Sequence, residues 1–84
     1  MSDLAAQVSL YPLGADDLSP QIDTVIEIFQ KHGLHVEIGP MSTLLSGEEG
    51  TLFAALHEAA RAAGDAGKMV MVVTISNACT VAMP

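Results

Sequence analysis

The sequence has little positive charge. Three Lys and Arg residues stand against ten Asp and Glu residues, which gives a formal net charge of −7 over 84 residues. Proteins that bind nucleic acids neutralise phosphates with Lys and Arg, so this shortage argues against that class of function. An acidic chain is better suited to a neutral or cationic ligand.

Cysteine and long hydrophobic runs are also scarce. Cys79 is the only cysteine, so no disulfide forms within the chain, as is typical of a reducing compartment. The longest apolar run, residues 69–73, is far shorter than the roughly 20 residues that span a bilayer. The N-terminal residues lack the positive charge of a secretory signal. These features predict a cytoplasmic protein that does not enter a membrane.

Half of the residues are hydrophobic, and their spacing predicts a mixed fold. Period-two alternation and turn residues predict strands over residues 5–11, 34–39, 41–46 and 68–77. Helical spacing predicts helices over residues 19–32 and 48–63. The second and third strands form either a hairpin or one bent ribbon around Gly39-Pro40. The resulting order predicts one ferredoxin-like α+β domain over residues 1–84, with an antiparallel four-stranded sheet and two helices on one face.

The last predicted strand is apolar on both of its faces, unlike the first strand. Both helices cover the same face of such a sheet, so something else must cover the other face. We therefore expect a second subunit and a homo-oligomer. In the second helix, the expected inner stripe consists of Leu52, Phe53, Leu56, Ala60 and Ala63.

The catalytic and metal-binding templates are incomplete in this sequence. His57-Glu58 resembles the start of a zinc-protease helix, but Arg61 occupies the position of the second histidine. Residues 47–50 place two carboxylates where a phosphate-binding loop would hold its anion. We expect no catalytic residues, no metal site and no enzymatic activity.

Polar side chains interrupt otherwise apolar predicted strands. Hydroxyl and amide groups beside apolar surface suit a flat, hydrogen-bonding heterocycle. The same groups also suit a solvated sheet face, and the spacing alone leaves both interpretations open. The side chains in question are Ser9, Tyr11, Ser42, Thr43, Ser46, Thr74, Ser76 and Asn77.

Four segments in order resemble the signature of the small thiamine-binding, YkoF-like proteins. They are Val8-Ser9-Leu10-Tyr11-Pro12-Leu13-Gly14, His32-Gly33-Leu34, Glu37-Ile38-Gly39-Pro40-Met41-Ser42-Thr43 and Ser46-Gly47-Glu48. The resemblance runs from about residue 6 to residue 76. It implies a ferredoxin-like fold, dimers built into tetramers, binding of thiamine or its hydroxymethylpyrimidine moiety, and no catalysis. The chain departs from many members at its C-terminus, where residues 81–84 replace a charged helix.

The resemblance also implies ligand-binding residues. It assigns this role to Ser9, Tyr11, Gly14, Met41 and Thr43, while Ser76 and Asn77 are added because of their position at the end of the last strand. The leading hypothesis is a non-catalytic binder of thiamine or hydroxymethylpyrimidine, with the ligand held by strand hydroxyls near a subunit interface. The alternative is a regulatory or assembly module that uses the open sheet face for a protein partner.

Overall fold

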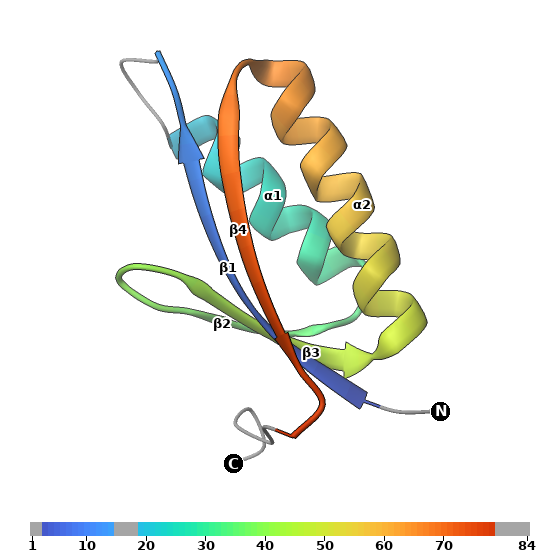
Figure 1. The fold of residues 1–84 in the computed structure, drawn as a ribbon. Helices are drawn as coiled ribbons and strands as arrows, with labels where there is room; N and C mark the ends of the chain where they lie inside the picture. Colours follow the sequence, from blue (N-terminus) through green and yellow to red (C-terminus); the bar gives the residue numbers. More distant parts are fainter. Residues whose placement is uncertain (1–2, 15–18, 79–84) are drawn as a thin grey trace.

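The computed structural model describes residues 3–14 and 19–78 of the chain. Strands and helices follow one another in the predicted order β-α-β-β-α-β (Figure 1). This order confirms the ferredoxin-like prediction. Their bounds are β1 Asp3–Pro12, α1 Ser19–Lys31, β2 His35–Ile38, β3 Thr43–Glu48, α2 Glu49–Ala66 and β4 Met69–Ser76.

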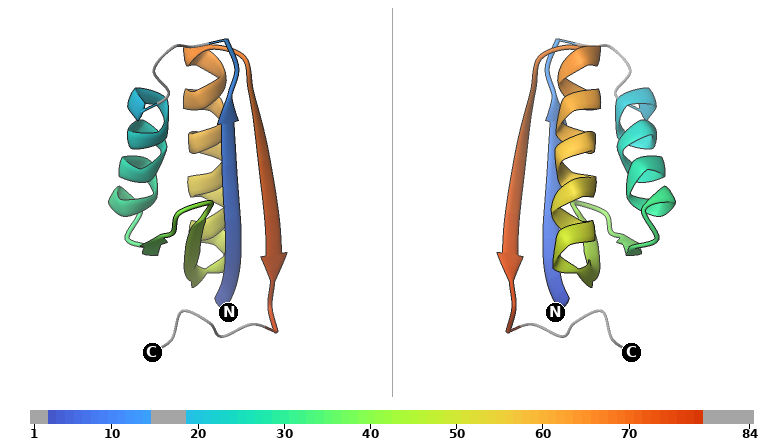
Figure 2. Two further views of the ribbon diagram at one scale, coloured as in Figure 1. Left: turned by 90° about the vertical axis from the view of Figure 1, so that its left-hand side faces the viewer. Right: turned by 90° about the vertical axis from the view of Figure 1, so that its right-hand side faces the viewer.

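The four strands form one antiparallel sheet in the order β2-β3-β1-β4. The central strand β1 pairs with β3 on one side and with β4 on the other. Both helices lie on the same side of the sheet, and in Figures 1 and 2 no helix or strand of the described residues covers the other side. One face of the sheet is therefore the core face, and we call the other the open face.

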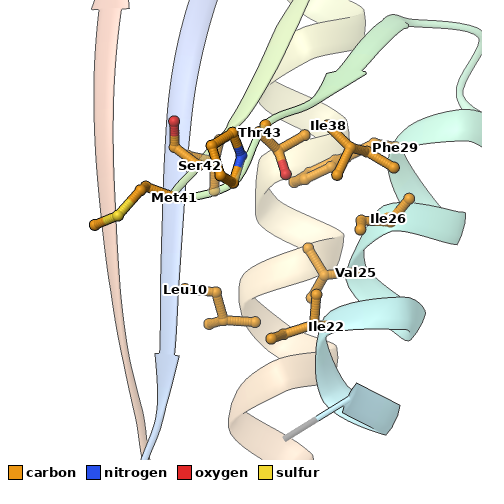
Figure 3. A pocket seen from close by; sticks show the side chains of 12 residues that line it. Leu10, Ile22, Val25, Ile26, Phe29, Ile38, Met41, Ser42 and Thr43 are labelled. Atoms are coloured by element: carbon orange, nitrogen blue, oxygen red, sulfur yellow. The ribbon is translucent and has the colours of Figure 1, made fainter.

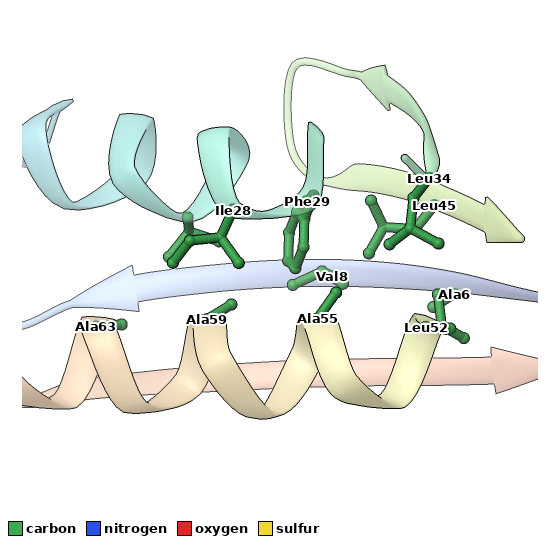
Figure 4. Close-up of a cluster of buried hydrophobic side chains, with 11 residues drawn as sticks. Ala6, Val8, Ile28, Phe29, Leu34, Leu45, Leu52, Ala55, Ala59 and Ala63 are labelled. Atoms are coloured by element: carbon green, nitrogen blue, oxygen red, sulfur yellow. The ribbon is translucent and has the colours of Figure 1, made fainter. Parts of the chain in front are cut away.

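The core lies between the two helices and strands β1 and β3 (Figure 4). Its largest fully buried side chains are Phe29, Leu45 and Leu52. The buried face of α2 carries Leu52 followed by three alanines at helical spacing, Ala55, Ala59 and Ala63. Small methyl side chains let the helix approach its neighbours closely, because less side-chain volume separates the two backbones.

The expected inner stripe of α2 is right for Leu52 and Ala63, wrong for the exposed Phe53, and lacks the buried Ala55 and Ala59. Phe53 is 50% exposed, whereas Ala59 is fully buried. The stripe that begins at Leu52 continues every three to four residues through the alanines, so Phe53, one residue further on, points about 100° away. Phe53 was predicted to be buried because it is the more hydrophobic residue, but the helix packs closely against its neighbours through its small alanine side chains.

Strands β2 and β3 form a hairpin, so the hairpin alternative is confirmed. The Gly39 N–H donates to the Ser42 carbonyl at 2.9 Å and closes the turn. Strand β3 begins at Thr43, two residues later than predicted, which places Met41 in the turn and not in the strand. The turn closed between Gly39 and Ser42 takes up Met41, and Pro40 within it has no backbone N–H to donate to a ladder.

The C-terminal end of α1 is tied to α2 by a carboxylate. Glu58 of α2 accepts a hydrogen bond from the His32 ring at 2.9 Å and pairs with Lys31. These contacts, with Lys31 the stronger cause, lower the pKa of Glu58 below its ordinary value of 4.5. Directly after α1, Gly33 adopts a positive φ of 78°, a conformation that glycine reaches without steric cost and that ends the helix.

We expect acid to weaken this helix–helix contact. A carboxyl group whose pKa is lower in the folded state than in the unfolded state stabilises the folded state at any pH above its unfolded-state pKa. This contribution disappears as the pH falls through the pKa of the folded state. The stability difference between the wild type and Glu58→Gln should therefore be present at pH 7 and shrink as the pH falls below the ordinary carboxyl value of 4.5. Urea denaturation across this range measures it, and a constant difference at every pH would contradict the expectation.

Candidate functional site

A groove opens between α1, strand β1 and the β2–β3 hairpin, on the core side of the sheet (Figure 3). Its volume is about 220 Å³. Ligand pockets for whole drug-sized molecules have roughly 300–1,000 Å³, so this groove suits part of such a molecule. It is lined by Val8, Leu10, Ile22, Val25, Ile26, Phe29, Ile38, Gly39, Pro40, Met41, Ser42 and Thr43.

The helix wall of the groove follows from the periodicity of α1. Val25 and Phe29 are buried against the sheet, while Ile22 and Ile26 are only partly buried. Residues at i, i+3, i+4 and i+7 share one helix face. The two buried residues therefore anchor α1 in the core, and the two isoleucines border the groove.

The opposite wall is the hairpin, which is held by two contacts. The turn is closed by the bond from Gly39 to Ser42, and Gln7 of β1 donates from Nε2 to Ser42 Oγ at 3.2 Å. A side chain on Gly39 would lie 3.0 Å from the Ser42 carbonyl oxygen, so glycine fits this turn best. Met41 at the tip is 82% exposed and forms the outer rim.

Thr43 supplies a polar side chain directly beside the apolar walls. It pairs with Val8 of β1 and with Ile38 of β2, which places it on the core face of the sheet. Figure 3 shows its side chain between the hairpin and Phe29, within the groove. A hydroxyl can both donate and accept a hydrogen bond. It can thus orient a heterocycle that the apolar walls sandwich.

None of the twelve side chains that line the groove is ionisable. The described part of the site therefore offers apolar contact, two hydroxyls and the backbone groups of a turn, and these lining residues supply no general acid or base. Within residues 3–14 and 19–78 no group of three or more His, Cys, Asp or Glu side chains is arranged to hold a metal ion. This arrangement suits binding of an uncharged, flat group.

The seven predicted site residues do not lie together at one site in the structure. Met41 and Thr43 line the groove. By alternation and strand pairing, Ser9 and Tyr11 lie on the open face opposite Val72 and Val70, and Ser76 lies on that face opposite Ala5. Gly14 follows β1 with a positive φ of 77°, and the exposed Asn77 follows β4. A role in ligand binding stays a prediction for all seven.

Sequence reasoning did not identify the apolar lining of the groove. Ile22, Val25, Ile26 and Phe29 fall within the helix predicted over residues 19–32, and that prediction does not indicate that they border a groove. Four apolar residues at this spacing are the ordinary core face of an amphipathic helix, so the sequence carried no signal that two of them border a groove. Cys79, the only cysteine of the sequence, lies outside the described residues.

No helix in the part of the chain that the structure describes combines the length and the apolar character needed to cross a bilayer. Comparison with known families gives one match. The profile of the family described as thiamine-binding protein matches residues 6–79. No curated protein sequence matches the chain.

Solved structures with the same fold come from archaea and bacteria. A hypothetical protein from Methanocaldococcus jannascii is 31% identical with a TM-score of 0.82, over 90% of this chain and 80% of that one. A domain of unknown function, DUF77, from Bacillus cereus is 28% identical with a TM-score of 0.77, over 89% and 75%. A candidate thiamine biosynthesis or salvage protein from Thermotoga maritima is 24% identical with a TM-score of 0.78, over 88% and 82%, and shows the fold alone.

Proposed function

Because the chain belongs to the thiamine-binding protein family, we propose that it is a non-catalytic binding protein for thiamine or its hydroxymethylpyrimidine moiety. The observation that carries the proposal is the groove: an uncharged, apolar slot with the Thr43 hydroxyl beside Phe29. In this proposal the pyrimidine ring enters the groove and the thiazolium ring stays outside. The predicted cytoplasmic location and the single domain over residues 1–84 are parts of the same proposal.

The chemistry of the ligand agrees with the lining. An aminopyrimidine is flat, uncharged at neutral pH and carries both donors and acceptors, which a hydroxyl and the backbone of a turn can satisfy. Ile22 and Ile26 contact one side of the ring, and Met41, with its adaptable thioether, covers the outer edge. The positive thiazolium ring then faces a chain with a net charge of −7, which attracts it.

Calorimetric titration with thiamine and with hydroxymethylpyrimidine tests the proposal. Thr43→Val keeps the shape of the side chain and removes the hydroxyl, so we expect it to weaken binding roughly threefold to tenfold. Thr43→Ser keeps the hydroxyl and is the matched control, with affinity close to that of the wild type. Equal affinity of the valine variant and the wild type would show that Thr43 makes no hydrogen bond to the ligand.

A melting experiment provides the second measurement. A ligand that binds only the folded chain stabilises it by about 2.7 kcal/mol at a concentration of 100 times its Kd. Saturating thiamine or hydroxymethylpyrimidine should therefore raise the Tm by several degrees. Neither heat nor a Tm shift with both compounds would overturn the proposed function.

The proposal includes self-association of the chain through its open face. Tyr11, Val70 and Val72 are each about half exposed there, although they are large and apolar. The edge strand β4 supports it as well, because its eight residues carry no charge and no proline. The other edge strand, β2, is four residues long and carries His35 and Glu37, which are common means of preventing edge contacts.

The same open face favours a second candidate function, a regulatory or assembly module for a protein partner. An exposed apolar face marks an interaction site without specifying the partner. The two functions differ in the groove, since only a binding protein needs Thr43. A stable oligomer that binds neither thiamine nor hydroxymethylpyrimidine is the result that would favour the assembly module.

A further inference from the structure

We propose that the groove selects the unphosphorylated form of its ligand. As a consequence, added salt should lower the affinity for a cationic ligand and raise the affinity for a phosphorylated one. This inference rests on the proposed function and deepens it. It names the class of ligand that the site accepts and the class that it rejects. Two observations support it. They are the positions of the few basic residues and the number of backbone N–H groups that the helix N-termini leave free.

Phosphate groups in proteins are held by Arg and Lys side chains or by free backbone N–H groups at helix N-termini. The chain has three basic residues, and none of them lines the groove. Lys31 is paired with Glu58 of α2. Arg61 and Lys68 lie on α2 and just before β4, and neither α2 nor β4 contributes a lining residue.

The helix N-termini replace the missing basic side chains only in part. The N-terminus of α2 is occupied by its own carboxylate, since Glu48 accepts hydrogen bonds from the N–H groups of Gly50 at 3.0 Å and Thr51 at 3.1 Å. Helix α1 begins with Ser19-Pro20, so Pro20 offers no N–H and only the N–H groups that follow it in the first turn are left as donors. Among the described residues, a phosphate at the mouth of the groove therefore meets no basic side chain, and a few backbone N–H groups compensate only in part for its lost hydration.

The net charge of −7 then acts on the ligand over a distance that the salt concentration sets. The screening length is about 30 Å at 0.01 M and about 8 Å at 0.15 M ionic strength. The radius of gyration of the chain is 12.4 Å, so at low salt the charges of the whole molecule act on the ligand, and at physiological salt only the nearest ones act. A cation is attracted, a neutral molecule is unaffected and a phosphate ester is repelled.

The test compares four ligands by calorimetry at about 0.01 M and about 0.15 M ionic strength and constant pH. The ligands are thiamine, thiamine diphosphate, hydroxymethylpyrimidine and its phosphate ester. At low salt we expect each phosphorylated compound to bind at least about tenfold more weakly than its parent. Raising the salt concentration should weaken the binding of thiamine, leave the binding of hydroxymethylpyrimidine unchanged and strengthen the binding of both phosphorylated compounds. The difference in affinity between each phosphorylated compound and its parent should therefore become smaller.

A gain-of-function variant separates a local effect from the net charge. Ile26→Lys places a cation at the wall of the groove, and Phe53→Lys adds the same charge on the exposed side of α2. We expect Ile26→Lys to reduce the difference in affinity between hydroxymethylpyrimidine and its phosphate ester more than Phe53→Lys does. Equal narrowing by both variants would contradict a local role of the uncharged groove.

The outcomes separate this inference from the proposed function. Phosphorylated compounds that bind as tightly as their parents, or more tightly, overturn the inference, while binding of thiamine or hydroxymethylpyrimidine itself leaves the proposed function intact. Absence of binding by all four compounds overturns the proposed function, and the inference with it. The ligand series uses the wild-type chain, so the result does not depend on whether a variant folds.

Discussion

Replacement of Phe29 by alanine is expected to remove about 3–5 kcal/mol from the free energy of unfolding. Phe29 has no exposed surface, and it lies at the centre of the core where α1 meets the sheet (Figure 4). Its removal leaves a cavity that the surrounding strands can fill only in part. Small domains have a total stability of about 5–15 kcal/mol, so the variant is expected to be partly or wholly unfolded at physiological temperature.

The chain offers a matched control for this variant, because it contains only two phenylalanines. Phe53 is 50% exposed on the outer side of α2, so Phe53→Ala should change the stability by much less. Urea denaturation at neutral pH measures both variants. Similar losses for the two would show that α1 does not pack in the way that we describe. Phe29→Leu, which retains an apolar side chain of smaller volume, should fall between the alanine variant and the wild type.

Replacement of Val72 by lysine is expected to dissociate the proposed oligomer. Val72 is 51% exposed on the open face, opposite Ser9 of β1. A lysine there places an unpaired charge in the contact between subunits, which costs several kcal/mol unless the charge finds a partner. In a two-fold symmetric contact each substitution occurs twice. The dissociation constant should therefore rise at least about a hundredfold.

Analytical ultracentrifugation over a range of protein concentrations measures the association. Phe53→Lys is the matched control, since it introduces the same charge at a residue of nearly the same exposure, 50%, away from the open face. This variant should associate like the wild type. A wild type that stays monomeric at high concentration would overturn self-association, and dissociation by both variants would assign the contact to the net charge and not to the open face.

Much of the fold could be predicted from the sequence because the strands and helices carry strong periodic signals. Strand β1 alternates between core residues such as Val8 and solvent-facing residues such as Gln7, and the structure retains this alternation. The apolar run of β4 predicted two apolar faces, and in the structure Val70 and Val72 face outward while Met71 and Val73 pack on the core. In these segments each residue's local preference agrees with its place in the fold.

The site could be predicted only in part because its position depends on strand register. Thr43 faces the groove since it pairs with Val8, and a shift of one residue would turn it to the open face. Register is set by the hairpin turn, and the sequence placed Met41 in a strand instead of that turn. The family resemblance named residues on both faces of the sheet, such as Thr43 and Tyr11, without indicating that the sheet separates them.

The pairing of β1 with β4 has a consequence for how the chain acquires its structure. The first and last strands are adjacent along eight residue pairs, from residue 5 opposite 76 to residue 12 opposite 69. Contacts between such distant residues close a long loop before they stabilise anything, and proteins dominated by them fold slowly. During synthesis both helices and the β2–β3 hairpin leave the ribosome before β4 does. Until β4 arrives, β1 is an edge strand, and one side of the core lacks the cover of Met71 and Val73.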